Sequence, residues 1–246
     1  MSLILDWLAS LMPHLMLAPI VLPMLTAALM LLLKEEQQMT KVVMNISSTT
    51  LGLLVSIALL LWADQSGSST TMGVYLPGNW QAPFGIVLAV DRLTALMLVL
   101  TSSIALAAGL FSTARWHKAG VHFHPLFQLQ LMGLCGAFLT ADLFNLFVFF
   151  EIMLAASYGL LLHGSGRQRV QSGLHYIAIN LAASSLFLIG VSMLYGITGT
   201  LNMADLAQAI PQVSEAALHA QAARHLLVSQ PFWSARTSRL IRGTHN

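Results

Sequence analysis

The sequence predicts an all-α polytopic membrane protein with about six transmembrane helices. Of its 246 residues, 57% are hydrophobic and only 8% are charged, whereas about a quarter of the residues of a soluble domain are charged. A hydrocarbon core about 30 Å thick needs about 20 apolar residues in a helix, and six segments reach or approach that length. They are His14–Leu33, Val42–Trp62, Leu93–Thr113, Pro125–Thr140, Leu143–His163 and Leu174–Thr198.

The chain divides into four expected parts. Residues 1–13 form an N-terminal outer segment that contains no Lys or Arg. It therefore lacks the charged start of a secretory signal peptide, and we expect the first apolar segment to remain as a membrane span. Residues 14–113 form a three-helix region, residues 114–198 hold spans four to six, and residues 199–246 form an outer loop and a basic tail.

A small β-hairpin is expected in the outer loop of residues 63–90. Two short β-prone runs, Met72–Tyr75 and Gly85–Val90, flank a Pro-Gly-Asn turn signal. The aromatic rings of Tyr75 and Trp80 are suited to the headgroup level of a bilayer. We therefore interpret them as anchoring residues rather than as a ligand site.

The basic residues predict the orientation of the spans. Short cytoplasmic loops collect Lys and Arg, and six of these residues fall in the loops after spans one, three and five, whereas the alternate loops before span six hold only Arg92. The N-terminus is therefore expected outside. The six are Lys34, Lys41, Arg115, Lys118, Arg167 and Arg169.

The chain changes character after Ile210. The segment from Pro211 to Asn246 has no apolar run long enough to span a membrane, and it places four arginines on the side expected to be outside. The sequence leaves two interpretations open, a soluble tail or a coding sequence that is truncated or frame-shifted after about residue 210. The four are Arg224, Arg236, Arg239 and Arg242.

Glu151 is the main candidate for chemistry. It lies about 13 Å along the fifth span from Asp142, near the bilayer midplane. An ionisable group at that depth costs at least ~2.5–3.5 kcal/mol on insertion scales, and such residues usually face the bundle interior and mark ion or proton pathways. The alternative is a protonated carboxyl that hydrogen-bonds to a neighbouring helix as a packing contact. Asp142 itself is expected to cap the helix.

Three further polar residues could support a proton path with Glu151. Counting from Val170 puts His175 about 7–8 Å and Asn180 about 15 Å deep in the sixth span, so Asn180 is expected near the level of Glu151 and His175 between that level and the cytoplasm. Histidine titrates near neutral pH and can relay protons. Tyr158 shares a helical face with Glu151. Each could equally be a packing residue.

Other kinds of site are not indicated. His122 and His124 are two residues apart, which is a poor spacing for one helical face, and no Cys or carboxylate accompanies them, so no metal site is expected. There is no Gly-rich phosphate loop or Ser/His/Asp arrangement. The single cysteine, Cys135, excludes an intrachain disulfide. We expect no cofactor, no nucleic-acid partner and no soluble-enzyme active site.

Three stretches carry a family resemblance. These are DRLTALM (91–97), FQLQLMGLCGAFLTADLFNLFVFFEIMLAASYGLLLHG (127–164) and GLHYIAINLAASSLFLIGVSMLYGITGTLNMADLA (173–207). The sequence resembles the D subunits of Mrp/Pha-type multisubunit monovalent cation/proton antiporters, a family similar to the antiporter-like subunits of respiratory complex I. The resemblance covers roughly residues 10–210.

The resemblance implies a role for the chain. It implies the N-terminal part of a subunit of a hetero-oligomeric antiporter in the bacterial inner membrane, which exchanges protons for K⁺ or Na⁺ in pH homeostasis. It also implies that Glu151 carries protons and pairs with a lysine on a seventh span. No Lys follows Lys118 in this sequence, so we expect the chain as written to be transport-incompetent. Two alternatives stay open, a proton-pumping subunit of an NADH:quinone oxidoreductase or hydrogenase-type complex, and an inert membrane fragment or scaffold.

Overall fold

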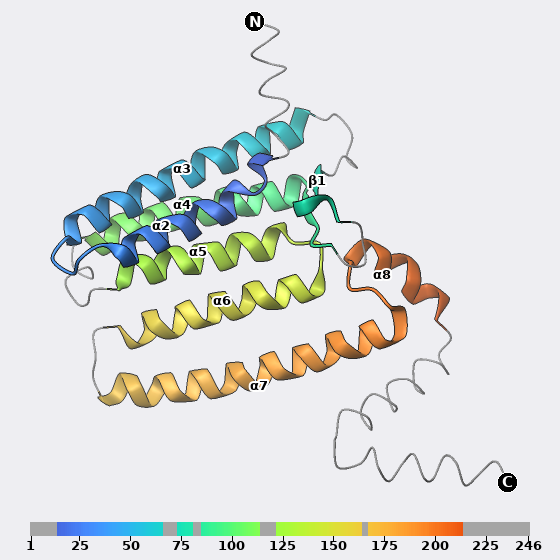
Figure 1. Ribbon diagram of the computed structural model, residues 1–246. Helices are drawn as coiled ribbons and strands as arrows, with labels where there is room; N and C mark the ends of the chain where they lie inside the picture. The colour runs from blue at the N-terminus through green and yellow to red at the C-terminus, as the bar shows by residue number, and fades with distance from the viewer. Residues whose placement is uncertain (1–13, 66–72, 81–84, 114–121, 164–166, 214–246) are drawn as a thin grey trace, which may run out of the picture.

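The computed structural model is a bundle of long helices with a small hairpin at one end (Figure 1). It describes residues 14–65, 73–80, 85–113, 122–163 and 167–213. The long helices are α2 (Ala18–Leu32), α3 (Gln38–Gln65), α4 (Arg92–Thr113), α5 (Phe123–Leu139), α6 (Leu143–Leu162) and α7 (Arg167–Thr198). The short elements are β1 (Gly73–Tyr75), η1 (Pro77–Asn79), β2 (Leu88–Val90), α8 (Met203–Ala209) and η3 (Ile210–Gln212).

The helices confirm the predicted all-α membrane architecture. Four of them, α3, α4, α6 and α7, are long and apolar enough to cross a membrane, and α2 and α5 are shorter apolar helices. The start of α3 corrects one expectation, because Lys41, predicted in the loop before the second span, lies inside α3 with a side chain that is only 2% exposed. The apolar run begins at Val42, but the helix continues backward to Gln38, and among these added residues Lys41 is buried.

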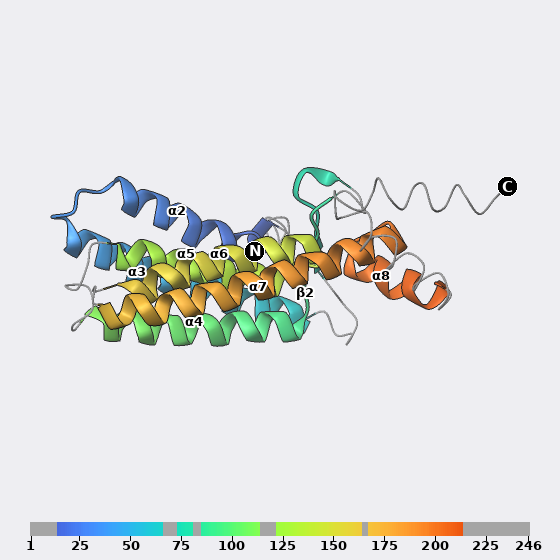
Figure 2. The same ribbon diagram turned by 90° about the horizontal axis from the view of Figure 1, so that it is seen from below.

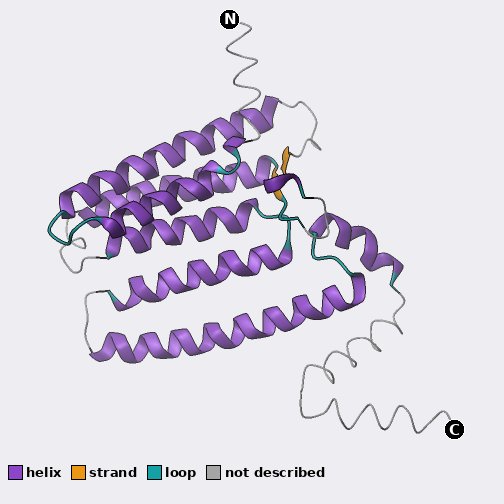
Figure 3. Ribbon diagram, in the orientation of Figure 1, coloured by secondary structure: helices purple, strands orange, loops and turns teal. Residues whose placement is uncertain are grey.

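The predicted hairpin is also confirmed. Strands β1 and β2 pair antiparallel with Gly73 opposite Val90 and Tyr75 opposite Leu88, and Figure 3 shows them at one end of the bundle. The Pro-Gly-Asn turn forms η1, in which Gly78 has a φ of 74°, a conformation that glycine adopts without steric cost. Trp80 is exposed. The Tyr75 hydroxyl lies 3.2 Å from His14 Nδ1.

The hydrophobic core lies where α2, α3, α4 and α5 pack together under the hairpin. It contains large apolar side chains from each of these helices and from β2, among them Ile20, Leu59, Leu88, Leu98 and Leu139. Figure 2 shows α2 and α4 on opposite sides of the row formed by α5, α6 and α7. Strand β2 thus closes the core at one end, and α6 joins the packed unit through α5.

Two glycines on α5 let α6 approach closely. A Cβ atom on Gly136 would lie 2.2 Å from ring carbons of Phe149, and one on Gly133 would lie 2.8 Å from the Cβ of Met153. Small residues allow helices in a membrane to pack at short range. The spacing of three residues in this part of α5 therefore sets the position of α6, the helix that carries Glu151.

The helices alternate in direction. The C-terminal ends of α2, α4 and α6 and the N-terminal ends of α3, α5 and α7 lie at one end of the bundle (Figure 1). The three loops expected to be cytoplasmic connect these same ends. The basic tail from residue 214 onward lies outside the described residues.

Candidate functional site

The start of α6 is fixed by a side-chain cap. Asp142 has extended backbone angles, and its carboxylate accepts a hydrogen bond of 2.9 Å from the backbone N–H of Asn145. This confirms the predicted capping role of Asp142. The Asn145 side chain donates to Thr140 Oγ1 over 2.9 Å, and an isolated β-bridge joins Asp142 to Asn202 just before α8. The N-terminal end of α6 is thus tied to two other segments.

Glu151 occupies the middle of α6. It lies about 12 Å along the axis from Leu143, in a helix about 30 Å long. Its carboxylate accepts a hydrogen bond from the hydroxyl of Ser184 on α7. The carboxylate is therefore directed into the interface between α6 and α7, as expected of an ionisable group in a membrane helix.

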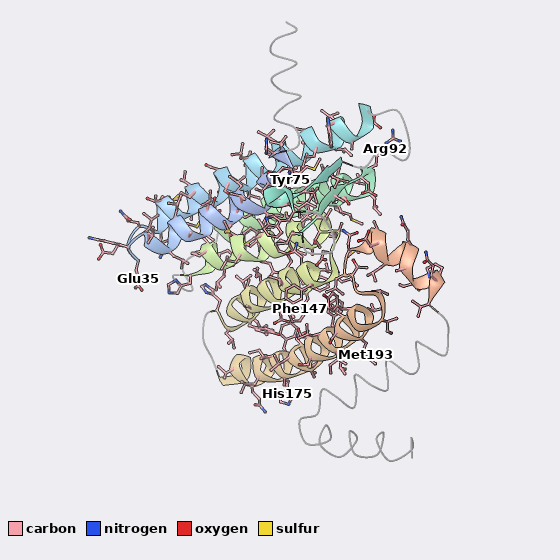
Figure 4. The ribbon with its side chains drawn as sticks, turned by 45° about the vertical axis from the view of Figure 1, so that its right-hand side comes forward. Glu35, Tyr75, Arg92, Phe147, His175 and Met193 are labelled. Atoms are coloured by element: carbon pink, nitrogen blue, oxygen red, sulfur yellow. The ribbon has the colours of Figure 1, made fainter. Side chains whose placement is uncertain are left out.

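Aromatic contacts hold α6 and α7 side by side around this hydrogen bond. Phe147 stacks on Phe187 with 6.2 Å between ring centroids, and Phe150 meets the same ring edge-on. Toward the other end, Tyr158 packs edge-on against Tyr176 at 5.6 Å. Figure 4 shows α6 and α7 with their side chains along this interface. Glu151 thus lies between two aromatic contacts.

A pocket of about 310 Å³ lies beside the Glu151–Ser184 pair. Its polar lining comes from α7 and its aromatic lining from both helices. Glu151 is not among the lining residues, and the pocket adjoins the carboxyl through its hydrogen-bond partner Ser184. Its lining residues are Phe147, Phe150, Met153, Leu154, Asn180, Ala183, Ser184 and Phe187.

The helix register places Asn180 one turn away from the expected level. Ser184, not Asn180, lies opposite Glu151, and Leu162 packs on Gly173. The first turn and a half of α7 therefore extend past the end of α6. The depth predicted for Asn180 was counted from Val170 and did not allow for this overhang. Asn180 donates to the Tyr176 carbonyl over 2.8 Å and lines the same pocket as Ser184.

The other two predicted residues lie farther along the helices. Tyr158 is two turns from Glu151, about 10 Å along the axis. His175 has an exposed side chain, and its Nδ1 lies 3.0 Å from the carbonyl of Gln171 in the preceding turn. Figure 4 shows His175 on the side of α7 away from α6. The structure therefore brings Tyr158 and Asn180 to the interface but not His175.

Sequence reasoning missed Ser184. The signal was present, because Ser184 is a hydroxyl residue within the run Ala-Ala-Ser-Ser of an apolar span, and small and hydroxyl residues are common where membrane helices meet. Choosing between Ser184 and Ser185 needs the register of α7. Ser185 is exposed and donates to the backbone carbonyl of Leu181.

The site is a carboxyl held in a polar contact between two membrane-length helices. Within the described ranges, no group of three or more His, Cys, Asp or Glu side chains could hold a metal ion. What the structure presents is a bundle of membrane-length helices with one carboxyl in an interhelical polar contact. This combination defines a polytopic membrane protein with a candidate proton-handling residue.

Comparisons with known proteins show what the chain is similar to. Residues 140–231 match the family described as "NADH:quinone oxidoreductase/Mrp antiporter, TM". The chain is 61% identical over 203 residues to the D subunit of a probable K⁺/H⁺ antiporter from Rhizobium meliloti, covering 82% of this chain and 37% of that protein. It is 39% identical over 206 residues to the D subunit of the Na⁺/H⁺ antiporter from Alkalihalophilus pseudofirmus, covering 83% of this chain and 41% of that protein.

A solved structure agrees with these relatives. A chain of the Mrp complex from Dietzia sp. DQ12-45-1b superposes with a TM-score of 0.75 at 31% identity, over 89% of this chain and 41% of that one. The chain is therefore similar to the N-terminal part of D subunits of cation/proton antiporters, and its residues 140–231 match the membrane-subunit family that includes them. It spans about two fifths of the length of these relatives. The family match runs to residue 231, past the change of character after Ile210.

Proposed function

We propose that the chain is part of the D subunit of a multisubunit monovalent cation/proton antiporter and that Glu151 takes up and releases the transported proton. The observation that carries this proposal is the contact between the Glu151 carboxylate and the Ser184 hydroxyl in the middle of the α6–α7 interface. The 61% identity to the D subunit of a probable K⁺/H⁺ antiporter supports the transport class.

The serine hydroxyl suits a carboxyl that changes its protonation state. A hydroxyl can donate one hydrogen bond and accept two. Ser184 can therefore donate to Glu151 when the carboxylate is charged and accept from it when the carboxyl is protonated. The pair therefore stays hydrogen-bonded in both protonation states. An unpaired buried polar group would cost about 1–3 kcal/mol, and an unpaired charged group would cost more.

Further polar groups follow the same interface toward the end expected to be cytoplasmic. Asn180 lines the pocket beside Ser184, and the Tyr176 hydroxyl lies 3.4 Å from Ser157 Oγ one turn farther on. Tyr158 packs on the same tyrosine. We propose Asn180 and Tyr158 as a supporting path to Glu151, and we leave His175 out of this path because its side chain is exposed on α7.

The same proposal places the protein in a bacterial inner membrane with its N-terminus outside. The partners would be the other subunits of the antiporter, the lipid bilayer, protons, and K⁺ or Na⁺. In this function the chain is a transporter subunit and performs no covalent catalysis. The Lys and Arg residues in the loops after the first, third and fifth predicted spans support the orientation.

Cation/proton exchange in everted membrane vesicles tests the role of Glu151. The substitution Glu151→Gln, placed in the assembled antiporter, is expected to abolish exchange of K⁺ and Na⁺ against protons, whereas Glu151→Asp is expected to keep part of it. Ser184→Ala is expected to slow exchange, and Ser185→Ala, its matched control on the exposed face, is expected to leave it unchanged. Exchange at the original rate with Glu151→Gln would refute the proposal.

One alternative function is supported by the family itself, whose description also covers NADH:quinone oxidoreductases. In that function, quinone reduction elsewhere in a complex drives protons through Glu151. Proton uptake by vesicles that depends on a quinone substrate rather than on a cation gradient would favour this alternative. A chain that co-purifies with no other subunit would favour the inert fragment or scaffold.

A further inference from the structure

A second polar region lies in the packed unit of α2, α3, α4 and α5, away from Glu151. It consists of seven side chains with hydroxyl or amide groups, each at most 8% exposed although the helices around them are apolar. Buried polar groups need hydrogen-bond partners, so their arrangement must be explained. The seven are Thr26, Asn45, Ser48, Thr49, Ser56, Ser102 and Gln128.

These side chains form three separate hydrogen-bonded groups. Gln128 Nε2 on α5 donates to Asn45 Oδ1 over 2.8 Å and to Thr49 Oγ1 over 3.2 Å, both on α3. Thr26 on α2 donates to Ser48 Oγ over 2.8 Å. The hydroxyls of Ser56 on α3 and Ser102 on α4 lie 3.2 Å apart. Each group joins a different helix to α3.

A small cavity lies between the three groups. Four of their members line it, namely Ser48, Thr49, Ser102 and Gln128, together with Gly52, Cys135 and apolar residues of α2 and α5. Its volume, measured for the centre of a water molecule, is about 20 Å³. A water molecule needs at least roughly 10–15 Å³ by this measure and two to four polar partners. The cavity therefore fits one water molecule.

The lining groups offer several acceptors. Thr26 has one hydroxyl proton and two acceptors within reach, the Leu22 carbonyl at 2.7 Å and Ser48 Oγ at 2.8 Å, and Ser48 Oγ has a lone pair that can accept a further bond. Ser56 donates to the Gly52 carbonyl over 2.8 Å, so Ser102 is the donor within the Ser56–Ser102 pair and its oxygen can accept a further bond. Since Gln128 Nε2 uses its hydrogens on α3, Gln128 Oε1 is a further acceptor.

We propose that this cavity binds one water molecule that donates its two hydrogen bonds to lining oxygen atoms of Ser48, Ser102 and Gln128. Buried water molecules make two to four hydrogen bonds. The water thus joins at least two of the three groups into one network centred on α3.

Cys135, the only cysteine of the chain, provides a reporter because it lines the cavity. X-ray radiolysis of bound water produces hydroxyl radicals next to that water, and cysteine sulfur reacts with them. The whole chain, in lipid nanodiscs exchanged into H₂¹⁸O, is irradiated, and the ¹⁸O taken up by Cys135 is measured by mass spectrometry. We expect Cys135 to be labelled although it is buried.

Gly52→Ala is the variant that fills the cavity. A Cβ atom on Gly52 would have its nearest contact at 4.0 Å, with Leu22, so the methyl group enters the cavity without strain. Gly190→Ala is the matched control, because a Cβ there meets nothing within 4 Å. Labelling of Cys135 is expected to fall several-fold in Gly52→Ala and to stay at the original level in Gly190→Ala.

Two results would overturn the proposal. One is the absence of ¹⁸O at Cys135 in the unsubstituted chain, and the other is equal labelling of Gly52→Ala and Gly190→Ala. If Gly52→Ala does not fold, Ser48→Ala takes its place. Thr26 keeps its bond of 2.7 Å to the Leu22 carbonyl in that variant, and unchanged labelling would again overturn the proposal.

Discussion

Substitution of Gly136 by alanine tests the contact that positions α6. A Cβ atom at this position would lie 2.2 Å from Phe149 Cδ1 and Cε1, whereas carbon atoms pack best at about 3.5–4.0 Å. The ring or the helix would have to move by roughly 1.3–1.8 Å. Such overpacking typically costs about 1–3 kcal/mol, and replacing glycine within a helix returns up to about 1 kcal/mol.

A control on α7 separates these two contributions. Gly190→Ala gains the same helix propensity but meets no atom within 4 Å. The free energy of unfolding of Gly136→Ala is therefore expected to be about 1–3 kcal/mol below that of Gly190→Ala. Unfolding of the purified protein in mixed micelles, followed by tryptophan fluorescence, measures both values.

The same assay can show that Phe149 is the cause. In a Phe149→Ala background, the cost of Gly136→Ala relative to Gly190→Ala is expected to disappear, since the clashing ring is gone. A double-mutant cycle with a coupling energy near zero would refute the reasoning. So would equal stabilities of Gly136→Ala and Gly190→Ala.

Two further predictions concern helix caps. The backbone N–H of Thr94 donates to Asp91 Oδ1 over 2.7 Å and lowers the pKa of that carboxyl. The stabilisation by this hydrogen bond is fully present above about pH 4, the ordinary pKa of aspartate. It is lost as the pH falls through the lower pKa of the folded state. The melting temperature of the original chain should exceed that of Asp91→Asn at pH 7, and the difference should shrink on acidification; a difference independent of pH would contradict this. Asn202→Ala removes the side chain that accepts from the N–H groups of Ala204 and Asp205, so it should cost about 0.5–2 kcal/mol of unfolding free energy, and hydrogen exchange in α8 should become faster. Unchanged exchange there would exclude the capping role.

The positions of the helices were largely readable from the sequence. Apolar length located all six long helices, and β-prone runs around Pro-Gly-Asn located the hairpin. The polar start of α3 was missed, because Lys41 is buried by neighbouring helices rather than by its own sequence context. Length and hydropathy report how well a segment suits the bilayer, and they do not report which polar residues other helices cover.

The candidate site was readable only in part. Glu151 was identified by its depth, and Asp142 by its position before an apolar run. The partner of Glu151 was not identified, because α7 extends past α6 and shifts the register by one turn, which brings Ser184 and not Asn180 to the carboxylate. The exposed position of His175 was also not predicted. A count of residues gives the depth of a side chain along a helix, but it does not give the face of the helix that packs against a neighbour.

The sequence by itself therefore determined that this chain is a polytopic membrane protein with a carboxyl at mid-depth, because the cost of placing charge in hydrocarbon acts on each segment separately. The tertiary structure decided which groups meet that carboxyl. It also decided which polar side chains of α2 to α5 enclose a cavity the size of one water. Both depend on how pairs of helices pack against each other, a property that no single segment contains.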